Sequence, residues 1–246
     1  MKLLSYLQIE YKLARRKAVQ LLQSGKVLLN NAEPENYQTE LNIGDMLSVE
    51  FPDGRKEKKI EAFPVIDSQL ILYHKPVGIV VSNDDPHNTT IYDHLPQGLR
   101  EYQYIGRLDK DSSGLLLLAN DKKLVHGLGH PSAGIVKTYL VRIDSLLDKE
   151  QIEQCITGMI VDEQGQAAVA GQTPEMGHDF LKFESVEQEQ RKGYVSLVIK
   201  LVEGHKRHIR RLLKACGKKV FALHRTAFGK YKLSDLKEGE WKVMDI

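Results

Sequence analysis

The sequence predicts an α+β fold, in which a small N-terminal α/β module precedes a larger domain built on a mixed, mainly antiparallel sheet with flanking helices. Apolar residues recur at helical spacing near the N-terminus, and strand-like and helix-like stretches alternate from about residue 67 onward. The alternation has neither the regular crossover period nor the Gly-rich phosphate loop of a doubly wound parallel sheet. A length of 246 residues suits one sizeable core and a small accessory domain.

The N-terminal module is predicted from helical periodicity and turn residues. Gly25 stands where the second helix would stop, and short strands are expected at 26–30 and 46–51, each followed by turn residues. The polar stretch 53–59 is the candidate connecting segment. The helical spacing is carried by Leu3, Leu4 and Leu7, then by Ala18, Leu21 and Leu22.

Three cations, Arg15, Arg16 and Lys17, open the second predicted helix. The helix macrodipole disfavours cations in a first turn, so this run costs some stability. It makes sense if a phosphate binds there and also accepts the free N–H groups of the helix. The alternative is a helix that starts earlier, near Tyr11, with a basic run that is merely solvated.

The larger domain is expected to alternate strands with helices. Apolar runs predict its strands at 70–73, 115–119, 139–143 and 195–202. Amphipathic stretches predict its helices at 124–128, 149–156 and 205–216. The module, a linker and this domain are therefore placed at 1–58, 59–66 and 67–246.

The charges are segregated along the chain, although the net charge is only +2. Residues 144–192 contain eleven acidic and four basic side chains, whereas residues 200–232 contain eleven Lys or Arg and a single acid, Glu203. The basic stretch is interleaved with apolar residues, so it belongs to a folded element. Such a distribution favours a face that meets a nucleic acid.

Composition disfavours several classes of protein. No apolar run reaches the ~18 residues that a membrane span needs, and the first residues lack the apolar core and cleavage site of a secretory signal. Cys155 and Cys216 lie far apart in sequence and match no metal spacing, so they are interpreted as two buried thiols in a reducing cytosol. We therefore expect a cytoplasmic protein that does not bind membranes.

The most informative segment spans residues 105–118. It places charged and small residues directly before a strand that is apolar on both faces. The carboxylate of Asp109 is thereby put in a loop anchored by the core, with Arg107 two residues away and able to point to the same side. From these residues alone, a catalytic carboxylate and a turn or ion-pair residue are equally good interpretations of Asp109.

The run G-R-L-D-x-D-S-S-G-L-L-L in this segment resembles the signature of pseudouridine synthases, specifically the RsuA type that acts on ribosomal RNA. Further stretches resemble the same family in the expected order, at 75–86, 130–141 and 203–225. The N-terminal module resembles the S4 RNA-binding domain at 14–18, 24–27, Asn30 and 43–45. Together these resemblances cover essentially the whole chain.

The resemblance implies roles for individual residues. Asp109 would act as nucleophile, or as the base that generates a reactive intermediate; Arg210 would be its charge partner, and Tyr139 would stack on the flipped uracil and help remove the carbon 5 proton. Either route needs an ionised carboxylate, which a neighbouring guanidinium supports. The product is an isomer of the substrate, so neither cofactor nor metal is implied. RNA contacts are expected from Arg107, Arg211, Lys137, Arg225, Arg15, Arg16 and Lys17.

The expected target is 16S rRNA of the small subunit, either free or in an assembly intermediate, and the enzyme is expected to be a monomer. The same reaction on 23S rRNA is the alternative, as is a non-catalytic RNA-binding protein that uses only the S4-like module. The second alternative would not need Asp109, Tyr139 and Arg210 together. His208 stands where relatives usually carry Gln or Glu, which leaves its role open.

Two other kinds of site are less favoured by the residues. Asp109 and Asp111 resemble the carboxylate pair of a hydrolase, but two residues apart in an extended chain they would point to opposite sides. His205, His208 and His224 suggest a metal site, but they lie among cations that would repel a dication.

Overall fold

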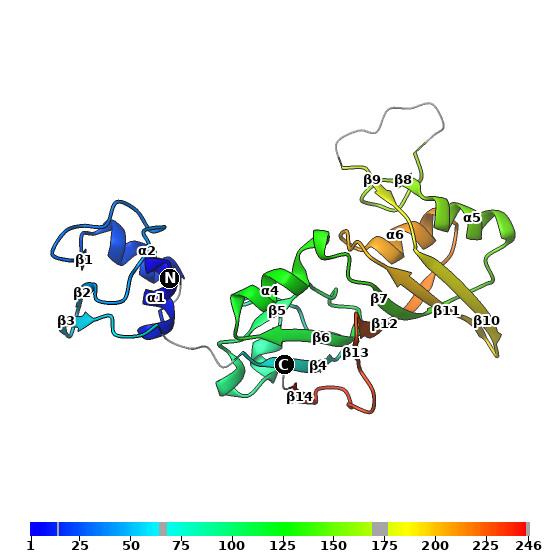
Figure 1. Cartoon of the computed structure of the whole chain (residues 1–246). Coiled ribbons are helices and arrows are strands. Elements are labelled where there is room, and N and C mark those ends of the chain that lie inside the picture. The colour runs from blue at the N-terminus through cyan, green and yellow to red at the C-terminus, as the bar shows by residue number, and fades with distance from the viewer. Residues whose placement is uncertain (14, 64–67, 169–176, 245–246) are drawn as a thin grey trace. The chain divides into compact units, whose positions relative to one another are not determined.

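The computed structural model describes residues 1–13, 15–63, 68–168 and 177–244. The chain divides into two compact units, the first unit at Met1–Asp67 and the second unit at Ser68–Ile246. Figure 1 shows the elements of each unit in chain order. Among the described residues, no helix is long and apolar enough to cross a membrane.

The first unit packs two helices with a small antiparallel sheet. Its buried core is formed mainly by leucines of α1, together with residues of α2 and β2. Helix α2 begins at Arg15, so the three cations do occupy its first turn, and the alternative start near Tyr11 is wrong. The elements are α1 (Leu3–Glu10), α2 (Arg15–Gln23), β1 (Val27–Leu29), β2 (Met46–Phe51) and β3 (Gly54–Lys59), with strand order β1-β2-β3.

The stretch 53–59, interpreted from sequence as a connecting segment, is instead largely strand β3. It pairs with β2 along its whole length, from Phe51↔Gly54 to Met46↔Lys59. All six residues of β3 are exposed, and charged side chains are typical of an edge strand that must not pair with another chain. Ile60 is fully buried in the same core. The described part of the expected linker therefore belongs to the first unit.

The second unit is built on a mixed, mainly antiparallel sheet, as the sequence predicts. In the described part of the chain the sheet has nine strands, in the order β10-β11-β7-β12-β6-β4-β14, with β13 paired to β12 and β5 to β6. A separate two-stranded sheet joins β8 and β9. The strands are β4 (Leu70–Lys75), β5 (Gln103–Ile105), β6 (Ser113–Ala119), β7 (Lys137–Ile143), β8 (Met159–Val161), β9 (Asp179–Leu181), β10 (Ser185–Arg191), β11 (Tyr194–Leu201), β12 (Val220–Phe228), β13 (Tyr231–Lys232) and β14 (Trp241–Met244).

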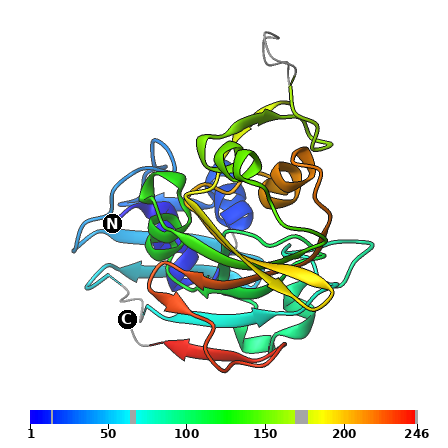
Figure 2. The same ribbon diagram turned by 90° about the vertical axis from the view of Figure 1, so that its right-hand side faces the viewer.

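Helices cover parts of this sheet. Helices α5 and α6 lie together over the strands β7, β11 and β12 in Figure 2, and the Sγ atoms of Cys155 and Cys216 lie 3.6 Å apart where these helices meet. Helix α4 packs on β5 and β6. The helices of the second unit are α3 (Ile91–His94), α4 (Lys122–Gly129), α5 (Lys149–Thr157) and α6 (His208–Ala215), with short 3-10 turns at Gln97–Leu99 and Pro131–Ala133.

The two halves of the large sheet meet at a short parallel seam between β12 and β6. The seam consists of the pairs His224↔Ser113 and Arg225↔Gly114. Gly114 has a φ of 110°, and a Cβ added there would lie 2.3 Å from the carbonyl oxygen of Arg225. The close approach of the two strands therefore requires glycine at this position. The seam places the loop before β6 directly beside β12.

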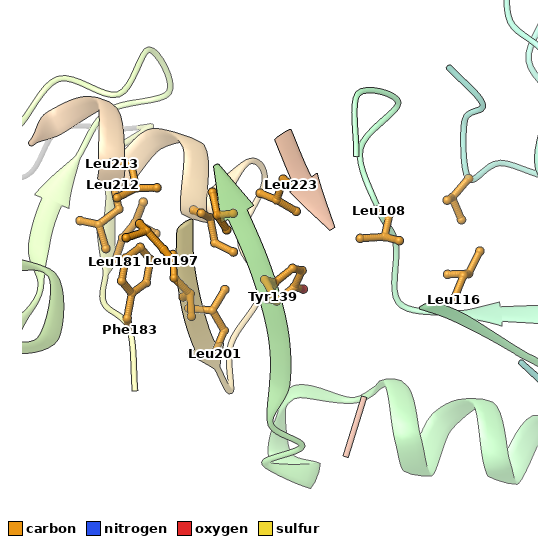
Figure 3. Packing of buried hydrophobic residues seen from close by; sticks show 14 of the residues in the cluster. Leu108, Leu116, Tyr139, Leu181, Phe183, Leu197, Leu201, Leu212, Leu213 and Leu223 are labelled. Carbon is orange, nitrogen blue, oxygen red and sulfur yellow. The ribbon is translucent and has the colours of Figure 1, made fainter. Parts of the chain in front are cut away.

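The core explains why β6 is apolar on both faces. Leu116 and Leu118 belong to a large buried cluster with β7, β11 and α6, whereas Leu115 and Leu117 belong to a second cluster on the other side of the sheet. Figure 3 shows part of the first cluster, from Leu116 to the α6 leucines. A strand buried on both faces holds its neighbours rigidly, which suits the end of a loop that carries a functional side chain.

Candidate active site

Asp109 lies on a tight turn between β5 and β6. The N–H of Ser112 donates to the carbonyl oxygen of Asp109 at 3.1 Å, closing the turn. Leu108 and Ser112 on either side are buried, while Asp109 itself is partly exposed. The core therefore fixes both ends of the turn and leaves the carboxylate accessible.

The side chain of Lys75, at the end of β4, holds the backbone of this turn. Its side chain is fully buried, and Nζ donates to the carbonyl oxygens of Asp109 at 3.1 Å, Ser112 at 2.7 Å and Pro76 at 2.9 Å. Burial lowers the pKa of Lys75 to about 8, while the charges of Asp109 and Asp111 oppose this shift. The sequence prediction did not include Lys75 in the site, although it lies within a stretch that resembles the family.

Arg210 on α6 reaches the same turn but binds Asp111 rather than Asp109. Its Nη2 donates to the carbonyl oxygen of Asp111 at 2.8 Å, and its Nε lies 3.3 Å from Asp111 Oδ2. Within the described residues, no hydrogen bond or ion pair links the Asp109 carboxylate to another side chain. The predicted ion pair between Asp109 and Arg210 is thus wrong as a direct contact, because the arginine binds Asp111, two residues further along the turn.

Arg210 and Asp109 nevertheless share one electrostatic environment. Burial lowers the pKa of Arg210, and the carboxylates of Asp111 and Asp109 both act against that shift. Lys75 interacts with the same two carboxylates. Two cations, Lys75 and Arg210, therefore lie within electrostatic range of the Asp109 carboxylate.

Asp111 accepts hydrogen bonds from a second arginine of the same segment. Arg207 forms a bidentate contact with Asp111, in which Nη1 donates to Oδ1 at 3.3 Å and Nη2 donates to Oδ2 at 3.1 Å. Burial alone would raise the pKa of Asp111, but the Arg207 hydrogen bond and the charges of Arg210 and Arg207 lower it. Asp111 is therefore the ion-pair residue of this loop, a role that the sequence left open for Asp109.

Tyr139 lies on β7, paired with Ile199 of β11 and Arg225 of β12. It is 7% exposed and belongs to the same buried cluster as Leu108, the residue before Asp109. Figure 3 shows Tyr139 between β7 and the loop that carries Leu108. The fold thus places Tyr139 and the residue before Asp109 in the core on the same face of the sheet.

Two of the predicted RNA contacts are wrong, because their side chains are buried. Arg211 donates to the carbonyl oxygens of Val161 and Asp162 and pairs with Asp179 at 2.5 Å, which fastens α6 to β8 and β9. Arg225 is 1% exposed and donates to the carbonyl oxygen of Leu115 at 2.7 Å. Neither guanidinium is accessible to a phosphate.

Lys137 is also less available than predicted. Its Nζ donates to the carbonyl oxygens of Val202 at 2.6 Å and Ile135 at 3.2 Å, and burial lowers its pKa. Arg107 is exposed beside Asp109, as an RNA contact requires. Arg15, Arg16 and Lys17 are exposed on the first turn of α2, where the first two line a surface hollow with Val19, Gln20 and Gln23.

His208 has a structural position. It is 5% exposed, its Nε2 lies 3.0 Å from the carbonyl oxygen of Lys182, and its ring stacks on Phe183. Burial lowers its pKa to about 4, so the ring is neutral near pH 7 and links α6 to the segment after β9. Among the described residues, no group of three or more His, Cys, Asp or Glu side chains is arranged to hold a metal.

Comparisons with known proteins agree with the geometry. Residues 69–215 match the family model for RNA pseudouridylate synthase. The chain is 30% identical over 228 residues to ribosomal large subunit pseudouridine synthase B of Bacillus subtilis, covering 92% of this chain and 85% of that protein. It is 28% identical over 247 residues to ribosomal small subunit pseudouridine synthase A of Pasteurella multocida, covering 99% and 96%.

Other relatives are longer, and one solved structure shares the fold. The chain is 31% identical over 240 residues to ribosomal large subunit pseudouridine synthase B of Pseudomonas aeruginosa, covering 94% of this chain but only 56% of that protein. A crystal structure described as a pseudouridylate synthase superimposes with a TM-score of 0.60 at 24% identity, covering 99% of this chain and 96% of that one.

Proposed function

The chain belongs to the RNA pseudouridylate synthase family, and from that premise we propose that it isomerises a uridine of ribosomal RNA to pseudouridine with Asp109 as its catalytic carboxylate. One observation carries the assignment of the residue. Asp109 is partly exposed on a turn whose backbone is held by the buried ammonium of Lys75, and its own carboxylate is not used in holding that turn. A group fixed by its backbone and left accessible by its side chain is suited to react with a substrate.

The chemistry needs such a group in its ionised form. In pseudouridine formation the bond between carbon 1′ and nitrogen 1 breaks, the uracil turns and carbon 5 bonds to carbon 1′. The carbon 5 proton then leaves and nitrogen 1 gains a proton, so the product is an isomer. An ionised carboxylate serves either as the nucleophile or as the base that starts this sequence. Lys75 and Arg210 lie within electrostatic range of Asp109, and neither blocks its carboxylate with a direct contact.

Tyr139 is the proposed partner for the uracil. It lies on β7, paired with Arg225 of β12, and belongs to the same buried cluster as Leu108, the residue before Asp109, which supports this role. A target base must leave its stack before chemistry, and an aromatic ring offers a flipped base a new stacking surface. We assign Tyr139 to that stacking and to assistance in removing the carbon 5 proton.

The proposed substrate is ribosomal RNA, free or in an assembly intermediate, bound by the monomeric enzyme. Exposed cations support this on both units: Arg107 beside the site, and Arg15, Arg16 and Lys17 at the start of α2, in a first unit proposed to be an S4-like RNA-binding domain. The sequence favours 16S rRNA, whereas the relatives in B. subtilis and P. aeruginosa are named for the large subunit. Mapping pseudouridine in both rRNAs of a strain that lacks this protein separates the two targets.

The catalytic assignment is tested by Asp109→Asn, which keeps the size of the side chain and removes its charge. Tritium release from carbon 5 of labelled rRNA should fall by at least about a thousandfold, the scale seen when a catalytic group is removed. The affinity for RNA should persist, because the phosphate contacts lie elsewhere. Asp235→Asn is the matched control, since Asp235 is exposed in the same unit and, among the described residues, forms no hydrogen bond or ion pair with the turn.

Two outcomes would refute the assignment. If Asp109→Asn kept more than a few per cent of wild-type turnover, another residue would carry the chemistry. If it failed to fold while Asp235→Asn folded normally, Asp109 would be a structural residue, as one of the sequence alternatives holds. An unmodified rRNA with the wild-type enzyme would favour the non-catalytic RNA-binding alternative.

A further inference from the structure

We infer that Asp111 is a positioning residue for the reaction: its single carboxylate draws Arg207 and Arg210 onto the catalytic turn and thereby sets the cation that faces Asp109. The inference rests on the proposed function, since it names the residue that organises the proposed site. It concerns a contact that the family resemblance did not suggest, because the resemblance pointed to a direct pair between Asp109 and Arg210.

The hold of Arg210 on the turn is incomplete without Asp111. Of its five N–H groups, those on Nη2 reach the carbonyl oxygen of Asp111 at 2.8 Å and Ser112 Oγ at 3.5 Å. The buried Nε has no hydrogen-bond acceptor among the described residues and is balanced only by Asp111 Oδ2 at 3.3 Å. The carboxylate charge of Asp111 is therefore the main compensation for a guanidinium that is 13% exposed.

Arg207 approaches the same carboxylate from the solvent side. It precedes α6 in a left-handed conformation, with φ 52°, which costs a non-glycine residue of order 1 kcal/mol. That conformation directs its guanidinium to both oxygens of Asp111, three residues before Arg210. A strained backbone that persists at such a point is maintained by the contacts around it, here the fork onto Asp111.

The two guanidiniums repel each other, and Asp111 is the charge between them. Arg207 lowers the pKa of Arg210, whereas Asp111 raises it. Lys75 is a third cation that interacts with Asp111. If Asp111 lost its charge, Arg210 would face Arg207 with only Asp109 as a nearby anion. We expect Arg210 to leave its position, and the turn that it contacts to shift with it.

This arrangement predicts that the loss of the Asp111 charge lowers turnover without weakening the binding of RNA. Asp111→Asn should lower kcat about 10- to 100-fold, the range expected when a site is displaced by about 1 Å. KM and the Kd for rRNA should stay the same or fall, because two guanidiniums lose an internal partner and remain beside a polyanion. A variant that merely unfolds would lose binding together with turnover.

A second substitution distinguishes positioning from a general loss of stability. Arg207→Gln removes the repelling cation, so the double variant Asp111→Asn/Arg207→Gln should recover kcat several-fold relative to Asp111→Asn alone. Asp235→Asn again serves as the matched control and should behave as wild type. Wild-type kcat in Asp111→Asn would overturn the inference, and so would a double variant no more active than Asp111→Asn.

A readout independent of turnover separates this inference from the proposed function. In wild-type protein labelled with ¹⁵N-arginine, the Nε–H signal of Arg210, assigned with Arg210→Lys, should be protected from solvent exchange. In Asp111→Asn that protection should fall at least tenfold. Unchanged exchange would overturn the positioning role even if the enzyme is active. A wild-type enzyme that leaves rRNA unmodified would refute the proposed function, and the exchange result would still decide whether Asp111 holds Arg210.

Discussion

The first turn of α2 and the segment from α6 to β12 are both rich in arginine and lysine, yet they use these side chains differently. Arg15, Arg16 and Lys17 are exposed at a helix start. Arg211 and Arg225 are buried and donate to carbonyl oxygens of the fold itself. A basic sequence therefore indicates a nucleic-acid surface only where its side chains are exposed to solvent. In α6 the same residue type builds the scaffold of the proposed site.

The largest effect is expected from Arg211→Ala. This change leaves the Asp179 carboxylate with only His205 as an ion-pair partner and removes the donor from the carbonyl oxygens of Val161 and Asp162, so the free energy of unfolding should fall by about 3 kcal/mol. Urea unfolding followed by the fluorescence of the single tryptophan, Trp241, measures this in the second unit. A loss below about 1 kcal/mol would mean that the buried Arg211 contributes no more to stability than an exposed arginine does.

A smaller effect is expected from the titration of His208. Its pKa is about 4 in the folded protein and about 6.5 in the unfolded chain. Between these values the unfolded chain binds more protons, so stability is fully present above pH 6.5 and is lost as the pH falls toward 4, by about 3 kcal/mol at most. His208→Gln should flatten this part of the stability profile, measured by urea unfolding at a series of pH values. An unchanged profile would exclude His208 as its source.

The smallest effect on stability is expected from replacing Arg15, Arg16 and Lys17 together by Ala. These side chains are exposed, so the free energy of unfolding should change by less than about 0.5 kcal/mol. The affinity for RNA should nevertheless fall, and the slope of log K against log salt should become shallower by roughly 2 to 3 if three phosphate contacts are lost. Filter binding at several salt concentrations tests this; an unchanged slope would show that α2 does not contact the RNA backbone.

The sequence predicted the elements whose apolar pattern is strong and missed those whose pattern is polar. Strands β6, β7 and β11 and helix α5 lie where the apolar runs indicate, because their residues face a core. Strand β3 carries only glycine and charged residues, and β10 is mostly polar, so neither has an apolar pattern to detect. An edge strand has one unpaired edge in solvent, and charged side chains there keep it from pairing with another chain. The same charged side chains leave no apolar pattern from which to predict the strand.

The motif order named Asp109, Tyr139 and Arg210 as candidates for the site, and these roles stay predictions. It did not indicate that Arg210 binds Asp111, because that contact depends on how α6 approaches the turn. The burial of Arg211 follows from the packing of α6 on β8, which adjacent positions in a sequence do not reveal. Lys75 escaped prediction because a fully buried lysine is rare and composition argues against it.

The short seam between β6 and β12 has a consequence for how the chain acquires its activity. The hydrogen bond from Arg225 to Leu115 joins residues 110 positions apart, so β6 and the proposed catalytic turn before it are synthesised long before the strand that completes them. Pairing over such a distance carries a large loop-closure cost and forms late. We therefore expect a nascent chain to present the basic turn of α2 first and to order the proposed catalytic turn only when β12 has been added. The capacity to hold RNA would precede the capacity to modify it.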